Sequence, residues 1–208
     1  MTGPGLEYGT ATENSLQLRQ RQATVSGAVE NNMPPTPTVQ RIFKIFNRAE
    51  AIERFEVLEK SLGNVKRRFH GTKALCGLGV LLNGAACMRP ECNACNICAN
   101  GFEVRGEHYS RFGDGVYTSA TSGKSNDYAG NDNKAHGKTF RCMFLCKVAA
   151  GKTYKIQLGN LPADQCPPPV SVAGYDSVVG DVGGVGGLNY DELCDSVLPA
   201  YWIVYQLN

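Results

Sequence analysis

Apolar residues recur at helical spacing near the start of the chain. Four of them define one helical face: Ile52, Phe55, Leu58 and Leu62. Gly63 and Asn64 follow and are typical of a helix end. Asn47 and Glu50 have the spacing of a capping box, in which two side chains satisfy the first free N–H groups of a helix. The pattern predicts an amphipathic helix over 48–62.

Apolar and polar positions alternate farther along the chain, which is typical of strands. We expect strands at 65–71 (VKRRFHG), at 140–148 (FRCMFLCKV) and at 201–207 (YWIVYQL). The segment 39–46 (VQRIFKIF) fits either a strand or a helical turn, since a short apolar run does not distinguish them. One early helix followed by strands and long loops predicts an α+β fold with a mainly antiparallel sheet.

The first part of the chain differs in composition from the rest. Residues 1–36 are rich in Gly, Thr, Gln and Asn without an apolar period, which predicts a disordered or tether-like tail before a single domain at 37–208. No apolar run approaches the roughly 18 residues of a membrane span, and no signal-peptide stretch is present. We therefore expect no membrane partner and an intracellular protein, in the cytoplasm or nucleus. The net charge of +2 is too small to argue for nucleic-acid binding.

Five of the nine cysteines lie within 76–98, with the spacing C-x10-C-x4-C-x2-C-x2-C. A C-x2-C turn lets two thiolates bind one zinc ion, and two further thiolates complete a tetrahedral structural site. Without an export signal, metal binding is favoured over a disulfide, although a disulfide pair and free thiols stay open. Five cysteines for four ligand positions leave one spare.

Three short segments carry candidate chemistry: FHGT at 69–72, GDGVYTSATSGKSNDY at 113–128, and YDEL at 190–193 followed by LPAYWIVY. Taken singly, each has an ordinary interpretation. A lone histidine is usually packed or solvated, tyrosines often lie in a core or at its rim, and an acidic residue at a strand edge is usually solvated.

Together and in this order, the segments resemble the three motifs of the poly(ADP-ribose) polymerase-like ADP-ribosyltransferases, which are known by a His, Tyr and Glu triad. The resemblance spans about 39–208 and includes VQRIFKIFN and YDSVVG. It implies the ADP-ribosyltransferase fold, a split and mainly antiparallel sheet that binds NAD without a Rossmann crossover. The absence of GxGxxG after a strand agrees with this.

The resemblance implies catalytic roles for Glu192, His70 and Tyr117. Cleaving the bond between nicotinamide and ribose develops positive charge on the sugar, as in glycoside hydrolysis. A carboxylate at Glu192 would stabilise that charge. The implied NAD-binding residues are His70 and Thr72 at the ribose, Gly71 and Ser125 at the carboxamide, and Tyr117 and Tyr128 against the nicotinamide ring.

The implied reaction releases nicotinamide and transfers ADP-ribose to a nucleophile on a protein or a nucleic acid. Transfer of one unit is favoured over chain growth, because the Gly-rich loop at 180–187 offers no obvious cationic or aromatic docking residues for an ADP-ribose acceptor. The segment after Glu192 is shorter than is usual in the family. Asp191 is adjacent and also acidic, and a slip of one residue would move Glu192 out of the pocket. An inactive module binding NAD, ADP-ribose or a partner, and an NAD hydrolase, therefore stay open.

The cysteine insert at 76–98 is similar to that of fungal members of the family. This resemblance implies zinc bound by Cys76, Cys87, Cys92 and Cys95, with Cys98 as the substitute. The insert falls where the family has the loop that lies over bound NAD. Our hypothesis is that zinc restricts the unbound conformations of that loop and lowers the cost of ordering it.

Overall fold

The computed structural model describes residues 36–77, 82–84, 86–87, 89–104, 114–130, 133–135, 137–157, 174–181, 190–194 and 196–207. The predicted tail lies outside the described residues except for Thr36, so the domain boundary near residue 37 stays a prediction.

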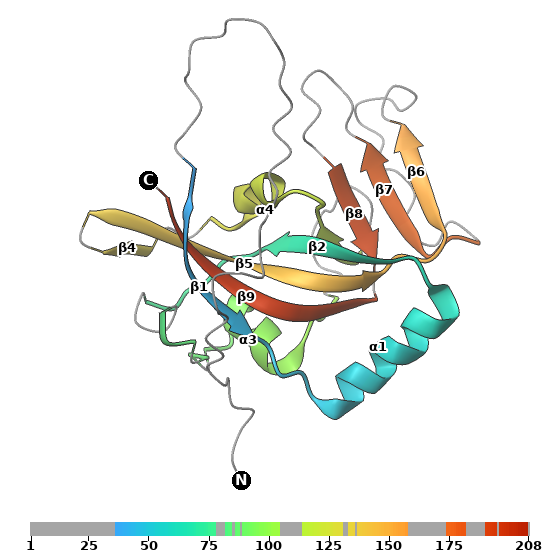
Figure 1. The fold of residues 1–208 in the computed structure, drawn as a ribbon, viewed down its shortest axis with the longest axis horizontal. Coiled ribbons are helices and arrows are strands. Elements are labelled where there is room, and N and C mark those ends of the chain that lie inside the picture. The colour runs from blue at the N-terminus through green and yellow to red at the C-terminus, as the bar shows by residue number, and fades with distance from the viewer. Residues whose placement is uncertain are drawn as a thin grey trace, which may run out of the picture.

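Two β-sheets form the framework of the molecule, one at its centre and one to the side (Figure 1). The five-stranded sheet has the order β1 (Thr38–Lys44), β9 (Val197–Leu207), β5 (Lys138–Ala149), β2 (Val65–Gly71), with β4 (Asn133–Ala135) paired to β5. The four-stranded sheet has the order β3 (Val116–Thr118), β8 (Tyr190–Cys194), β7 (Ser177–Asp181), β6 (Thr153–Gln157). Among the described pairs only β6 and β7 run parallel, which confirms the predicted α+β fold with a split, mainly antiparallel sheet.

The early helix is α1 (Ala49–Leu62), close to the predicted 48–62. It ends at Gly63, whose φ of 68° favours glycine. The predicted capping box is wrong, because Arg48 is the N-cap and makes no side-chain cap hydrogen bond. Asn47 instead donates from Nδ2 to the carbonyl oxygen of Pro199 at 2.8 Å. This hydrogen bond ties the start of α1 to β9.

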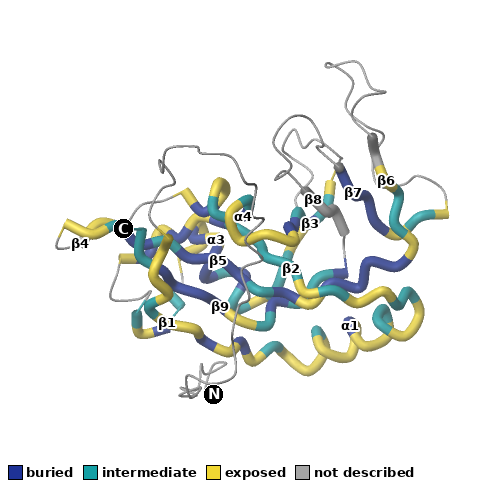
Figure 2. Tube along the Cα trace, turned by 45° about the horizontal axis from the view of Figure 1, so that its top comes forward, coloured by how far each residue is buried: buried dark blue, intermediate teal, exposed yellow. Residues whose placement is uncertain are grey.

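The main core lies against one face of the five-stranded sheet, where β5 presents the predicted alternation of buried residues. Phe144 on β5 is fully buried and stacks on Trp202 of β9 at a centroid distance of 6.4 Å. The segment 39–46, which fits either a strand or a helical turn by sequence, lies largely in strand β1. This strand pairs with β9 and buries Phe43 beside Trp202. Figure 2 shows the buried residues concentrated along β5 and β9.

Two further short helices are α3 (Asn93–Asn100), which begins within the cysteine insert, and α4 (Ser122–Tyr128), which follows β3. The two sheets meet at Phe69 of β2 and Ser119, which exchange backbone N–H to carbonyl hydrogen bonds of 2.8 Å in both directions. This pair holds the end of β2 beside β3, and both sheets therefore contribute residues to the space next to His70.

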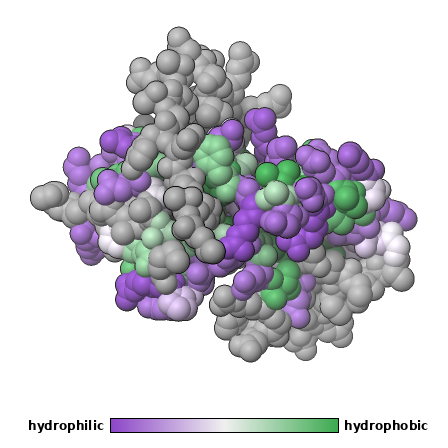
Figure 3. All heavy atoms as spheres, turned by 90° about the horizontal axis from the view of Figure 1, so that it is seen from below, coloured by the Kyte–Doolittle hydropathy of each residue, from purple (hydrophilic) through white to green (hydrophobic). Residues whose placement is uncertain are grey.

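The described surface is mixed in character. In the view of Figure 3, hydrophilic residues cover much of the described surface and hydrophobic residues form separate smaller patches. Within the described ranges, no helix has the length and apolar character needed to cross a bilayer.

Candidate active site

A cavity of about 420 Å³ lies between α3, α4 and the adjoining ends of β2 and β3. All six residues that the resemblance assigned to NAD binding line it: His70, Gly71, Thr72, Tyr117, Ser125 and Tyr128. Segments about fifty residues apart in the sequence therefore form one site. Their roles toward NAD stay predictions, but their convergence is a property of the fold.

His70 lies near the end of β2, and its Nδ1 is 2.8 Å from the carbonyl oxygen of Tyr117 on β3. A carbonyl only accepts hydrogen bonds, so Nδ1 carries the proton and, in the neutral ring, Nε2 is an acceptor. Burial lowers the pKa of His70 below its usual 6.5 and outweighs the opposing effect of the hydrogen bond to Tyr117. The ring is therefore neutral at pH 7, and Nε2 has no hydrogen-bond partner among the described residues.

Gly71 allows β2 and α4 to approach closely. A Cβ atom built on Gly71 would lie 1.7 Å from the carbonyl oxygen of Ser125, so no other residue fits without moving backbone. Ser125 itself is 3% exposed, and within the described part of the chain its hydroxyl has no hydrogen-bond partner. A free hydroxyl and the backbone of Gly71 are thus placed on the same wall of the cavity.

Asn126 fixes α4 against the five-stranded sheet. Its Oδ1 accepts a hydrogen bond of 2.8 Å from the Tyr205 hydroxyl and one of 3.3 Å from Arg141. Arg141 also donates to the backbone carbonyl of Asn126 at 3.3 Å. Because Ser125 precedes Asn126 directly, these bonds to β5 and β9 determine where its hydroxyl lies.

Two tyrosines border the cavity in different ways. Tyr117 is half-buried within β3, whereas Tyr128 at the end of α4 is 54% exposed. The ammonium group of Lys124 lies 5.1 Å from the centroid of the Tyr128 ring, within the range of a cation–π contact. One aromatic wall is therefore part of a sheet, and the other is an exposed ring beside a cation.

Glu192 lies in the middle of β8, between β3 and β7. Its backbone is paired with Thr118, a residue of the cavity wall, and with Val179 on the other side. Asp191 is paired with Gly180. The backbone register thus brings Glu192 opposite a cavity residue, one position from the Tyr117–Leu193 pair.

The cavity also contains residues that the sequence analysis did not predict. Helix α3 contributes Asn93, Asn96 and Ile97, and Phe102 follows the helix directly after Gly101. The sequence analysis assigned no secondary structure to the insert. The spacing of Asn93 and Asn96, three residues apart and so on one helical face, was a usable signal for this wall.

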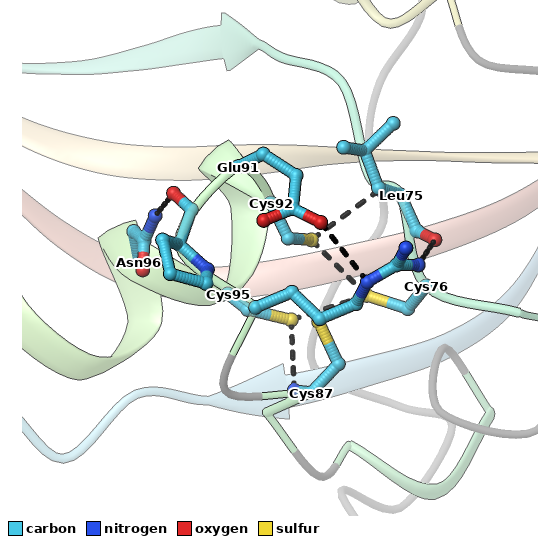
Figure 4. A network of polar contacts seen from close by, with 9 residues as sticks. Leu75, Cys76, Cys87, Glu91, Cys92, Cys95 and Asn96 are labelled. Atoms are coloured by element: carbon cyan, nitrogen blue, oxygen red, sulfur yellow. Dashed lines mark hydrogen bonds and ion pairs between the residues drawn. The ribbon is translucent and has the colours of Figure 1, made fainter.

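Four cysteines of the insert converge beside the cavity: Cys76, Cys87, Cys92 and Cys95. Their sulfur atoms all lie within 4.8 Å of one another, and Figure 4 shows them directed toward a common centre. The Sγ of Cys76 is 3.3 Å from that of Cys92 and 3.1 Å from that of Cys95. The four residues implied by the resemblance are thus the four that meet, and Cys98 is not among them.

The chemistry of this cluster fits a zinc ion. Four thiolates at the usual Zn–S distance of about 2.3 Å form a closed structural site. Backbone N–H groups donate to two of the sulfurs, from Leu75 to Cys92 at 3.3 Å and from Cys87 to Cys95 at 3.2 Å. Burial raises the pKa of the Cys92 thiol. Hydrogen bonds from the Cys95 N–H, the Cys76 thiol and the Leu75 N–H have the larger, opposite effect and lower the pKa to about 7. Donors of this kind stabilise thiolate ligands.

The comparison with known families agrees with this geometry. The sequence model of the poly(ADP-ribose) polymerase catalytic domain matches residues 20–181. The match begins within the predicted tail, contains every described residue named above for the cavity wall, and ends before Glu192. It covers well over half of the chain, and the split antiparallel sheet is consistent with it. The chain therefore belongs to the poly(ADP-ribose) polymerase catalytic domain family.

Proposed function

We propose that the protein is an ADP-ribosyltransferase that releases nicotinamide from NAD and transfers a single ADP-ribose unit to a nucleophile. The observation that carries the proposal is the convergence of His70, Gly71, Ser125 and Tyr117 on one cavity, with the strand of Glu192 beside it. The acceptor is a protein side chain or a nucleophile on another molecule such as a nucleic acid.

The nicotinamide end of NAD binds next to α4. The backbone of Gly71 and the hydroxyl of Ser125 hydrogen-bond the carboxamide, which is supported by the close approach of these two residues. Tyr117 and Tyr128 contact the ring from two sides. Aromatic contacts of this kind contribute about 0.5–1.5 kcal/mol beyond the burial of area.

The ribose binds beside β2. The Nε2 atom of His70 accepts a hydrogen bond from a ribose hydroxyl, because Nδ1 already donates to the Tyr117 carbonyl. Thr72, which is buried and lines the cavity, lies next to the sugar. Both contacts orient the ribose before the reaction, which lowers the entropic part of the barrier.

Glu192 is the proposed catalytic carboxylate. As the bond between the ribose carbon and the nicotinamide nitrogen breaks, its electron pair leaves with nicotinamide, and the sugar becomes a cation of oxocarbenium type. The carboxylate stabilises that cation and accepts a hydrogen bond from a ribose hydroxyl. The acceptor nucleophile then forms the new bond to the same carbon and loses its proton.

Transfer of a single unit is the preferred outcome. Chain growth needs a second surface that binds an already attached ADP-ribose. The sequence between β7 and β8 is rich in glycine and contains no lysine, arginine or aromatic residue over 182–189. We therefore expect one mass increment per modified site rather than a series.

We also propose that Cys76, Cys87, Cys92 and Cys95 hold a zinc ion. When bound, zinc would supply a covalent-like crosslink between the segment after β2 and the helix α3. Because α3 forms one wall of the cavity, this crosslink keeps the wall ordered in the absence of NAD. Less conformational freedom is then lost when NAD binds.

Two other functions compete with transfer. An inactive module that binds NAD, ADP-ribose or a partner is favoured by the short segment after Glu192 and by the end of the family match at residue 181. Hydrolysis of NAD with water as acceptor would use the same cavity. Nicotinamide release together with a covalent adduct supports transfer, release alone indicates hydrolysis, and neither product indicates a binding module.

A further inference from the structure

We propose that Phe102 is a positioning residue that holds the imidazole of His70 in one orientation and one tautomer. The inference rests on the proposed function, in which the Nε2 atom of His70 accepts a hydrogen bond from the ribose. Phe102 belongs to none of the three motifs, and it lies four residues after the cysteine insert.

The imidazole is held from several directions. The Phe102 ring meets it edge to face, with centroids 4.9 Å apart and planes at 76°. The Phe144 ring centroid lies 6.5 Å from that of the imidazole. The Tyr117 carbonyl oxygen accepts a hydrogen bond from Nδ1 at a distance of 2.8 Å. A flip of the imidazole about its χ2 bond would carry Nδ1 away from that carbonyl. The aromatic neighbours oppose this flip sterically, because the ring has to sweep through the space they fill.

Phe102 is itself fixed by its place in the chain. It follows Gly101, the C-cap of α3, whose φ of 80° and ψ of −167° belong to a region that only glycine adopts readily. The N–H of Gly101 donates to the Ile97 carbonyl at 3.0 Å. The Phe102 ring also packs edge to face on Phe144, with centroids 6.4 Å apart. The end of α3 therefore determines where the Phe102 ring lies.

This arrangement connects the cysteine cluster with the ribose site. Helix α3 begins at Asn93, directly after Cys92, and contains Cys95, and Phe102 is the second residue beyond its last turn. The cysteine cluster fixes the first part of α3. Phe102 follows the last turn and contacts His70, so the position of that end of the helix determines how the imidazole is held. A wall residue just beyond the insert thus controls which nitrogen of His70 is available as an acceptor.

The Phe102→Leu variant keeps an apolar residue and removes the ring edge. We expect the imidazole then to flip between two orientations, so that the Nδ1–H and Nε2–H tautomers are both populated. The hydrogen bond to the ribose is lost for part of the time. The Kd for NAD should rise by a factor of up to about ten, which corresponds to one hydrogen bond.

The test is ¹⁵N NMR of the histidine side chains in the full chain, purified without chelators and measured at pH 7.5 without NAD. The chain has three histidines, and His70→Gln identifies the signals of His70. In the wild type we expect a protonated Nδ1 and an unprotonated Nε2. In Phe102→Leu the two nitrogen shifts should move toward each other, while Phe102→Tyr, which keeps the ring edge, should resemble the wild type.

Phe46→Leu is the matched control, since Phe46 is partly exposed and does not line the cavity. Gly101→Ala is a second route to the same result, because strain at the C-cap displaces Phe102 without changing any side chain that touches His70. A mixture of tautomers in the wild type, or unchanged shifts in folded Phe102→Leu and Gly101→Ala, would overturn the proposal. None of these readings depends on catalysis, so absence of nicotinamide release contradicts only the proposed function.

Discussion

Gly71 and Ser125 approach each other so closely that a Cβ atom on Gly71 would lie 1.7 Å from the Ser125 carbonyl oxygen and 3.2 Å from its Cα. The contact joins the end of β2 to α4, and these two elements carry His70 and Ser125. Both obstructing atoms belong to the backbone, so a side-chain rotation cannot relieve the clash.

Gly71→Ala should therefore displace α4 from β2. We expect a loss of about 1–3 kcal/mol in the free energy of unfolding, which is typical of overpacking. The NAD affinity should fall by a larger fraction than the unfolding free energy does. Urea unfolding and calorimetric titration with NAD measure the two effects. The control is Gly123→Ala in α4, where nothing lies within 4 Å of the added carbon. Equal behaviour of the two variants would contradict the role given to this contact.

Asn126 offers a test of how α4 is held. In Asn126→Ala the Tyr205 hydroxyl and the Arg141 guanidinium lose a shared acceptor, at a cost of about 1–3 kcal/mol in unfolding free energy. NAD affinity should fall as well, because Ser125 is adjacent. Asn126→Asp keeps an acceptor oxygen beside Arg141 and should retain most of both properties. Thermal melting and NAD titration measure the two properties. Equal behaviour of Asn126→Asp and Asn126→Ala would contradict this account.

The metal proposal predicts one zinc ion per chain in native mass spectrometry. Cys95→Ser should lose the ion and lower the melting temperature, because Cys95 contacts Cys76 in the middle of the cluster. Cys98→Ser should keep it, since Cys98 lies outside the set of four. Removing the metal with a chelator should also weaken NAD binding. Full zinc content in Cys95→Ser would refute the ligand assignment, and loss in Cys98→Ser would place that residue in the site.

The lowered pKa of His70 predicts a pH dependence of stability. Between pH 6.5 and the pKa of the folded protein, the unfolded chain binds a proton at this residue and the folded chain does not. Stability from this source is therefore complete above pH 6.5 and declines as the pH falls below it. Glu103, Asp114 and Lys124 line the same cavity, so the comparison needs a variant that changes His70 alone.

Urea unfolding of the wild type and His70→Gln between pH 5 and pH 8 isolates this contribution. The difference between their unfolding free energies should be constant from pH 7 to pH 8 and should shift against the wild type below pH 6.5. A difference that stays flat down to pH 5 would mean that the pKa of His70 is not lowered in the folded protein.

Local pattern was sufficient to predict α1 and three of the strands, β2, β5 and β9. The alternation around Phe144 and the run ending at His70 reflect burial on one face of a sheet, which the sequence displays directly. The prediction of a capping box was wrong because the Asn47 side chain donates to the Pro199 carbonyl oxygen, in a contact between residues distant in sequence. Such competition between local and tertiary hydrogen bonds is invisible to a local rule.

The candidate site was predictable only in part, for a similar reason. The motif residues and the set of four cysteines were identified by resemblance, since the spacing alone left five cysteines for four ligand positions. Asn93, Asn96 and Phe102 were missed because the spacing of the two asparagines indicates a shared helical face but not that this face lines a cavity beside β2 and β3. Their role depends on where the cysteine cluster places the helix, which is a property of the folded chain.

The most direct test of the central claim is mass spectrometry of the protein after incubation with labelled NAD, following nicotinamide and covalent adducts together, for the wild type and Glu192→Gln. The substitution removes the charge and keeps the size of the side chain. We predict nicotinamide release matched by single ADP-ribose adducts in the wild type, and a rate lower by a factor of about 100 or more in Glu192→Gln. Unchanged release in Glu192→Gln, or no release from folded, zinc-loaded wild type, would contradict the proposed function.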